Sequence, residues 1–215
     1  MTTTPELIDQ LSGELSATPK GFVARRVALG VVGGAAIAAA VVLTLWGLRP
    51  DMASAIASFA FWAKLAYPAL LTALGLAATL RLARPDAGVA RSTWIGMGLV
   101  LAVMAGLASA ELWHMPPDAY GRVIMGSTAA TCPWLIALLA LPVLAITIAV
   151  LRRMAPTRLT LAGAAAGLTA GATAAFVYAW SCGETALPFV LIWYGIGMAI
   201  PVVVGALLGR FALRW

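Results

Sequence analysis

The sequence is poor in charge, since Asp, Glu, Lys and Arg make up only 10% of its 215 residues. A soluble domain carries about 25% charged residues, so this scarcity argues against a soluble globular protein. The excess of basic over acidic residues gives a net charge of +6. Such a charge can indicate nucleic-acid binding. Here, however, the basic residues lie at the ends of apolar segments, which is the pattern of membrane topology, and no direct nucleic-acid contact is expected.

The residues and motifs of common catalytic sites are scarce as well. There is one histidine, and the two cysteines do not form a C-x-x-C pair, which disfavours a disulfide-generating oxidoreductase. The chain has no glycine-rich nucleotide loop, no His-Glu metalloprotease motif and no evident Ser/His/Asp set. A transporter usually places several polar or acidic residues near the bilayer midplane, and these are almost missing. We therefore do not expect an enzyme, and a transporter loses support.

Long apolar runs are what the sequence has in abundance. Hydrophobic residues make up 62% of the chain, and the mean hydropathy is +0.97. The runs are about 20 residues long, enough to cross a hydrocarbon core of about 30 Å as a helix. They do not alternate in polarity as barrel strands do, so the fold class is all-α, a polytopic bundle of six transmembrane helices. The expected spans are 28–48, 56–80, 93–113, 133–151, 159–180 and 188–209.

Basic residues between the spans are distributed unequally. One side carries Lys20, Arg25, Arg26, Arg81, Arg84, Arg91, Arg152, Arg153, Arg158, Arg210 and Arg214. The other side has only Arg49 and Arg122, with Asp51, Asp118 and Glu184. By the positive-inside rule, both termini lie in the cytoplasm.

Glycine and tryptophan indicate how the helices pack and where they meet the interface. Small-xxx-small repeats allow close helix contact, which we expect within one chain; they are Gly30/Gly34, Gly163/Gly167/Gly171 and Gly205/Gly209. The tryptophans lie mostly near span ends and predict an interfacial belt. The oligomeric state is left open.

Residues 1–27 form a segment outside the membrane, separate from the transmembrane domain of residues 28–215. Thr3, Pro5 and Glu6 have the spacing of a capped helix start. The apolar residues that follow make one stripe on a short amphipathic helix, and they are Leu7, Ile8, Leu11 and Leu15. So short a helix is marginal alone in water and needs a membrane surface, the rest of the protein or a partner.

The two cysteines fall on the same predicted outer boundary of the bundle. Cys132 opens the fourth span, and Cys182 closes the fifth. Three interpretations stay open: two small buried residues, a disulfide, or a thiol-based sensor or metal site with His114 or Glu184 as further ligands.

Two other residues have both a structural and a functional interpretation. His114, the only histidine, lies at a span end and is either a hydrogen-bonded interfacial residue or a ligand or pH-sensitive group. Lys64 lies within a span, where charge is costly and indicates function by default. The alternative is that its side chain extends to the outer interface.

With enzyme and transporter disfavoured, the sequence has the layout of a signal transducer, a membrane scaffold with a cytoplasmic binding helix and an outer thiol pair.

The chain resembles the NrsF family of six-helix integral-membrane anti-sigma factors, which negatively regulate an extracytoplasmic-function (ECF) sigma factor of the SigF type. The resemblance covers nearly the whole chain. It rests on Glu6–Asp9 with Leu11 and Leu15, on Gly126 through Cys132-Pro133 to Ile136, and on Leu151 to Trp215 with Cys182, Glu184 and Trp193-Tyr194. Phe61-Trp62-x-Lys64-Leu65 is similar too. The family often has His-Cys-Pro-Glu where this chain has Ser181-Cys182-Gly183-Glu184, which weakens a ligand role for position 181.

The resemblance implies a multi-pass protein of the bacterial inner membrane, embedded in the lipid bilayer. The N-terminal segment, through Leu7, Ile8, Leu11 and Leu15, would hold an ECF sigma factor away from RNA polymerase. Cys132 and Cys182 would sense a metal or oxidative envelope stress, by a disulfide or by a heavy-metal ion of the zinc, copper or cadmium class. A small-solute permease and a structural subunit of a membrane complex are the alternatives.

Overall fold

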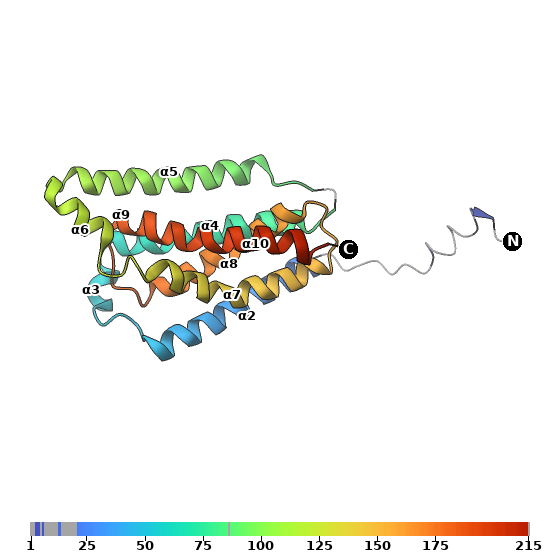
Figure 1. The fold of residues 1–215 in the computed structure, drawn as a ribbon, viewed down its shortest axis with the longest axis horizontal. Helices are drawn as coiled ribbons and strands as arrows, with labels where there is room; N and C mark the ends of the chain where they lie inside the picture. Colours follow the sequence, from blue (N-terminus) through green and yellow to red (C-terminus); the bar gives the residue numbers. More distant parts are fainter. Residues whose placement is uncertain (1–2, 5, 7–12, 14–20, 86, 215) are drawn as a thin grey trace.

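A computed structural model describes residues 3–4, 6, 13, 21–85 and 87–214 of the chain. Within these residues the regular structure is entirely helical (Figure 1). Six helices are long and apolar enough to cross a membrane. They are α2 (Phe22–Leu45), α4 (Phe59–Leu82), α5 (Arg91–Trp113), α7 (Cys132–Arg152), α8 (Leu159–Ala179) and the last span, Leu187–Ala212. The predicted fold class is therefore confirmed.

The first helix differs from the predicted span at its start. α2 begins at Phe22, six residues before the expected boundary, so Arg25 and Arg26 are helical. Gly21 precedes it with a φ of 86°, a conformation that favours glycine. A helix can extend past the hydrocarbon core into the polar interface, where the charged group of an arginine stays hydrated. The hydropathy pattern therefore marks the apolar part of the helix and not its first residue.

The last span contains three helical segments joined end to end. α9 (Leu187–Phe189) runs into a π-helical stretch, Val190–Tyr194, which continues as α10 (Gly195–Ala212). A π-helical stretch within a helix is rare and frequently marks a functional site. The remaining short elements join the spans at the end of the bundle where α9 lies (Figure 1). They are α3 (Met52–Ile56), the 3-10 turn Pro117–Ala119 and α6 (Tyr120–Met125).

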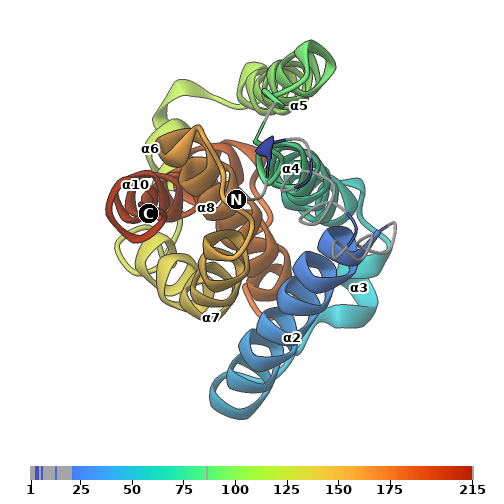
Figure 2. The same ribbon diagram turned by 90° about the vertical axis from the view of Figure 1, so that its right-hand side faces the viewer.

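Helix α8 is the centre of the bundle. It packs against α10, α4, α7 and α2, and the end-on view places it among these helices while α5 stands apart (Figure 2). Its sequence is rich in alanine and glycine, and most of its residues are buried. Thr169 of α8 and Thr79 of α4 are both fully buried, and their hydroxyls lie 3.2 Å apart. Small side chains on α8 thus let its neighbours approach closely.

The glycine repeats form contacts within the chain, as predicted. A Cβ on Gly163 would collide with the backbone of Gly205, and one on Gly167 would collide with the backbone of Pro201. Gly34 of α2 is similarly close to Val143 of α7. These positions therefore exclude any larger side chain, because backbone atoms cannot move aside as a flexible side chain can.

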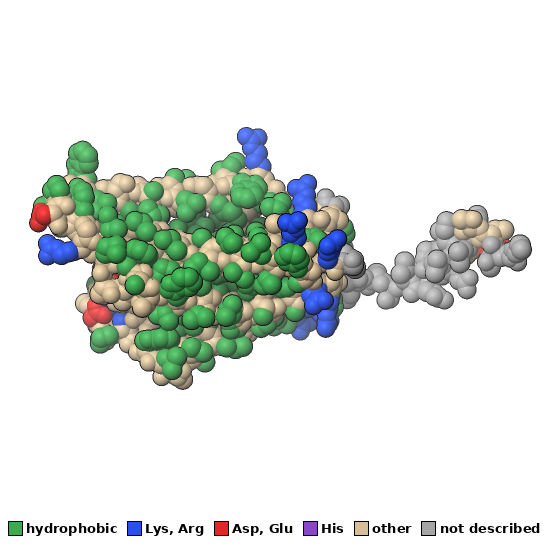
Figure 3. All heavy atoms as spheres, viewed as in Figure 1, with side chains coloured by type: hydrophobic (Ala, Val, Ile, Leu, Met, Phe, Trp, Pro, Cys, Tyr) green, Lys and Arg blue, Asp and Glu red, His purple; other side chains and the backbone are tan. Residues whose placement is uncertain are grey.

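Charged side chains separate to the two ends of the bundle, with hydrophobic side chains between them (Figure 3). We call one end the basic end, defined by Arg25, Arg26, Arg81, Arg84, Arg91, Arg152, Arg153, Arg158, Arg210 and Arg214. The other is the cysteine end, defined by Arg49, Asp51, Glu111, Asp118, Arg122, Cys132, Cys182 and Glu184. The start of α2 and the end of α10 both lie at the basic end (Figure 1). The predicted clustering of arginine on one side is thus present in the fold.

The tryptophans that the structure describes divide into two groups. Those with mostly exposed rings fit the predicted interfacial belt, and they are Trp46, Trp62, Trp94, Trp113 and Trp134. Trp180 and Trp193 are instead packed against the core. The Trp180 ring lies edge-on to Phe61 at 5.8 Å, and the Trp193 indole N–H donates to the Ile124 carbonyl at 2.8 Å. These two rings therefore join helices at the cysteine end.

The glycine contacts predict a matched pair of variants. Gly167→Ala should lower the free energy of unfolding by about 1–3 kcal/mol, because the added methyl meets backbone atoms of α10. Gly106→Ala on α5, where an added Cβ would meet no atom of another element within 4 Å, should instead stabilise the helix by about 0.5–1 kcal/mol. Unfolding in mixed detergent micelles measures both. Equal effects at the two positions would contradict the close packing of α8 on α10.

Candidate functional site

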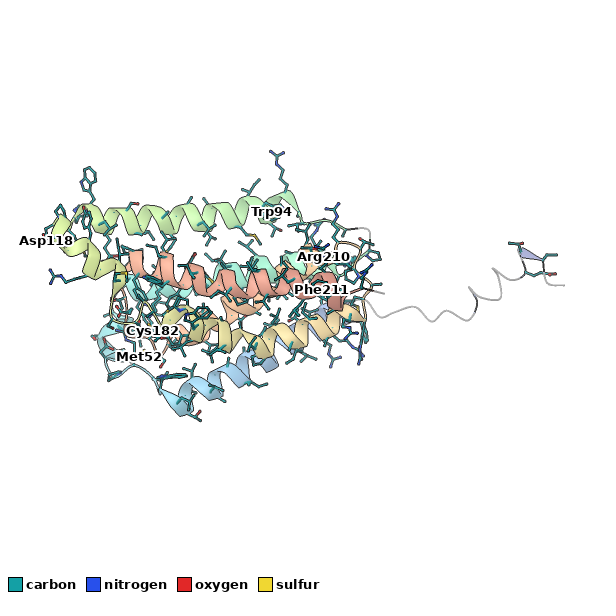
Figure 4. The ribbon with its side chains drawn as sticks, in the orientation of Figure 1. Met52, Trp94, Asp118, Cys182, Arg210 and Phe211 are labelled. Atoms are coloured by element: carbon teal, nitrogen blue, oxygen red, sulfur yellow. The ribbon has the colours of Figure 1, made fainter. Side chains whose placement is uncertain are left out.

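The two cysteines lie at the cysteine end, one at the start of α7 and the other just after the end of α8. Cys132 is the first residue of α7, and its N–H donates to the Thr128 carbonyl at 2.8 Å. Cys182 follows α8, and its N–H donates to the Tyr178 carbonyl at 3.1 Å. Both are free thiols and both are buried. Figure 4 shows Cys182 at the same end as Met52 and Asp118, opposite Trp94 and Arg210.

Lys64 of α4 holds the backbone that follows α8. Its side chain is fully buried, and Nζ donates one hydrogen bond to the Cys182 carbonyl and one to the Glu184 carbonyl, each 2.7 Å long. Nζ also lies 5.5 Å from the centre of the Tyr194 ring, which adds a cation–π contact. The Lys64 side chain is therefore buried, and it reaches the loop at the cysteine end without being exposed.

Glu184 connects the same loop to the turn before α7. Its Oε1 accepts hydrogen bonds from the Ser127 N–H at 2.7 Å and the Ser127 hydroxyl at 2.6 Å. The preceding Gly126 has a φ of 53°, and a Cβ there would meet Phe189 and the Glu184 carboxylate. Glycine thus allows Glu184 to approach this turn. The hydrogen bonds join the Cys182 loop to the segment that leads into Cys132.

Arg49 is a buried residue of this end whose partners lie in the α2–α3 loop. It forms an ion pair with Asp51 at 2.6 Å, and the Arg49 side chain is 4% exposed whereas that of Asp51 is 53% exposed. The hydrogen bonds of the pair lower the pKa of the Asp51 carboxyl and raise the pKa of the Arg49 guanidinium. The stabilisation from Asp51 is therefore present above its unfolded pKa of about 4 and is lost as the pH falls through the lower folded value.

The α2–α3 loop is also bound to the end of α8. The Ser181 hydroxyl donates to the Gly47 carbonyl at 2.7 Å, and the Arg49 N–H donates to the Trp180 carbonyl at 3.3 Å. On the other side of the site, Glu111 of α5 accepts the Leu187 N–H at 2.8 Å. The α2–α3 loop, the end of α8, α5 and α9 thus meet near the Cys182 loop.

Three buried polar atoms at this end have no hydrogen-bond partner among the described residues. They are Nη1 of Arg49, the hydroxyl of Thr128 and the hydroxyl of Tyr194. An unpaired buried polar group costs free energy, and such groups are rare in native structures. The site therefore keeps hydrogen-bonding capacity that its present arrangement does not use.

The predicted metal ligands are only partly brought together. His114 is exposed and follows the last residue of α5. Within the part of the chain that the structure describes, no three His, Cys, Asp or Glu residues are close enough to hold one metal ion. Cys132, Cys182 and Glu184 share the region, but one Glu184 oxygen is engaged by Ser127. These residues therefore do not fit a resident metal centre in this arrangement.

The predicted stripe of Leu7, Ile8, Leu11 and Leu15 lies outside the described residues. The helix start before it is partly described. The Thr3 N–H donates to Oε2 of Glu6 at 2.8 Å, which is the reciprocal hydrogen bond of a capping box. This hydrogen bond lowers the pKa of the Glu6 carboxyl. The predicted pairing of Thr3 with Glu6 is confirmed.

Sequence reasoning did not identify Arg49 or Ser127 as parts of the site. In the sequence Arg49 indicates only the topology, and the pattern that points to its ion pair is its position two residues before Asp51 in a loop that is otherwise apolar. Ser127 lies just after Gly126, in the stretch already compared with the family. Its role depends on a partner 57 positions away, for which the sequence gives no sign.

The Glu184–Ser127 contact predicts a loss of stability. Glu184→Gln should lower the free energy of unfolding by about 1–2 kcal/mol, because the carboxylate accepts two hydrogen bonds and a charged acceptor is worth more than a neutral one. The matched control is Asp118→Asn, an exposed carboxylate at the same end, which should change stability by about 0.5 kcal/mol or less. The same effect for both variants, measured by unfolding in detergent, would contradict the structural role of Glu184.

Comparisons with known proteins agree along the whole chain. The NrsF family, described as "Negative regulator of sigma F", matches residues 11–215. A protein of Azospira oryzae named "Probable anti-sigma-F factor NrsF" is 40% identical over 214 residues, which cover 99% of each chain. The "Anti-sigma-F factor NrsF" of Caulobacter vibrioides is 35% identical over 215 residues, with 99% of each chain covered. No solved structure matches the chain.

Proposed function

The chain belongs to the NrsF family of negative regulators of sigma F, and we propose that it is an anti-sigma factor which holds an ECF sigma factor at the bacterial inner membrane. The observation that carries the proposal is the similarity over 99% of the chain to two proteins named as anti-sigma-F factors. Regulators of this kind bind a protein and perform no chemistry on it. The scarcity of catalytic and transport motifs agrees with such a role.

We assign the basic end to the cytoplasm. Arginine is enriched on cytoplasmic loops, and ten arginines define this end. The N-terminal segment then lies in the compartment that contains the sigma factor, since α2 begins at the basic end. The stripe of Leu7, Ile8, Leu11 and Leu15 has the spacing of a helix that binds in an apolar groove of its partner.

The cysteine end then faces the outer compartment, and we propose that Cys132 and Cys182 sense an envelope stress there. Two chemistries suit a pair of thiols. A soft heavy-metal ion of the zinc, copper or cadmium class, arriving as the signal, displaces a proton from each thiol that it binds. Alternatively, an envelope oxidant takes two electrons and two protons from the pair and leaves a disulfide. Either event changes the loops around α8 and releases the sigma factor.

The N-terminal stripe gives the first test. Leu11→Asp should weaken the sigma factor complex more than tenfold, because it replaces a buried apolar contact by a charge that must lose its water. Ser16→Asp adds the same charge away from the stripe and serves as the control. The measurement is a pull-down from membranes with these variants, the full chain and a chain that lacks residues 2–18.

Two results would contradict the proposed function. The first is an equal yield of sigma factor with the full chain and with the chain that lacks residues 2–18. The second is the absence of any sigma factor from both, which would favour a permease or a structural subunit instead. Equal amounts of each variant in the membrane fraction are required for either comparison.

The cysteines give the second test. Cys132→Ala and Cys182→Ala should each reduce sigma factor release on exposure to cadmium or to a thiol oxidant by about tenfold or more, since each removes one of two cooperating ligands or redox partners. Alanine keeps a small apolar side chain, so a packing role alone would survive it. Thr131→Ala, next to Cys132 but exposed, is the control. A normal response in both cysteine variants, read from a sigma-dependent reporter, would reduce the thiols to packing residues.

A further inference from the structure

Lys64 is the feature that the proposed function leaves unexplained. It is an amino group with no exposed surface, within a membrane-spanning helix, on a chain that has only 10% charged residues. Such a position is costly and indicates a function. Its two hydrogen bonds go to backbone oxygens of Cys182 and Glu184, and within the described part of the chain no carboxylate forms an ion pair with it.

We propose that Lys64 is the positioning residue of the cysteine site, which holds the Cys182–Glu184 backbone in the arrangement that keeps the sigma factor bound. This inference rests on the proposed function and adds the residue through which the state of Cys182 reaches the rest of the bundle. In this structure both thiols are free and Lys64 forms both of its hydrogen bonds, and we assign this arrangement to the unstressed state.

The position of the two acceptors makes Lys64 sensitive to Cys182. The carbonyl that Nζ holds belongs to Cys182 itself, and the second acceptor is two residues further on, with the exposed Gly183 between them. Modification of the buried Cys182 thiol needs space or a new direction for its side chain, and the attached backbone must follow. A shift of either carbonyl leaves the amino group short of an acceptor in a buried place, which is unfavourable.

The helix that carries Lys64 is able to respond. Pro68 lies four residues after Lys64 and has no N–H, so the intrahelical partner of the Lys64 carbonyl is missing. Helices bend at such positions. The outer part of α4 is thus attached to the Cys182 loop at the point where the helix is easiest to bend.

The far end of α4 lies beside the start of α2. Leu80 and Arg84 line a groove of about 170 Å³ together with Gly21, Phe22, Val23 and Ala24. The N-terminal segment joins the bundle there, because α2 begins at Phe22. α4 therefore extends from the Cys182 loop to the base of the proposed sigma-binding segment, and a changed bend in α4 alters that base.

The test compares three variants of α4 in the full-length protein in its membrane. Lys64→Met keeps the length of the side chain and removes both hydrogen bonds, so the unstressed activity of a sigma-dependent reporter should rise about tenfold. Lys64→Gln keeps an N–H donor and should restore part of the repression. Thr79→Val removes a buried hydroxyl near the C-terminal end of α4. This variant should repress like the wild type, and it shows the effect of a structural defect alone.

Two measurements keep the outcome interpretable. Wild-type expression is adjusted to the membrane level of each variant, so poor insertion of Lys64→Met cannot mimic release. Hydrogen exchange of the purified protein should be faster at residues 182–187 in Lys64→Met than in Thr79→Val, whether or not a sigma factor binds. Slow exchange there, or repression and stress response like the wild type at equal level, would overturn the proposal. A wild-type chain that retains no sigma factor would instead refute the proposed function.

Discussion

The absence of hydrogen-bond partners in lipid is the constraint on which this structure depends. It requires helices for every crossing, and it also decides where polar side chains are placed. Threonine hydroxyls within the spans bond back to the carbonyl four residues earlier, at Thr44, Thr72, Thr79, Thr147, Thr169 and Thr173. Lys64 differs from these threonines, because both of its hydrogen-bond acceptors belong to the loop that follows another helix, α8. The buried amino group of Lys64 is thereby tied to the loop that contains Cys182.

The same constraint explains why α8 is so poor in large side chains. Helices in lipid gain little from burying apolar surface, so their association depends on close packing. Gly163 and Gly167 bring the backbone of α8 against that of α10, whereas most residues of α5 are not buried inside the bundle. The bundle therefore has a tightly packed centre and a loosely attached α5. The cysteine site is built on the tightly packed part, where a small displacement has to be passed to the neighbouring helices.

The sequence predicted the features that repeat along the chain. Hydropathy located all six spans, the arginines located one end, and the glycine spacing marked positions of close helix contact without saying which helices meet there. It also placed Cys132 and Cys182 at the same boundary. It did not predict the contacts of Lys64, because its acceptors are backbone carbonyls 118 and 120 positions away, and a carbonyl has no sequence signature. For the same reason the burial of Arg49 and the role of Ser127 emerged only from the fold.

The Cys182 loop is hydrogen-bonded to several other elements of the bundle, so a change at its thiol would act on all of them. The Cys182 loop is held by Lys64 from α4, by Ser127 from the turn before α7 and by Gly47 from the α2–α3 loop. No single one of these contacts is strong compared with a metal–thiolate or disulfide bond. Under the proposed sensing role, a chemical event at Cys182 would shift this loop and break some of these hydrogen bonds, and a two-state sensor requires such a difference between its two arrangements.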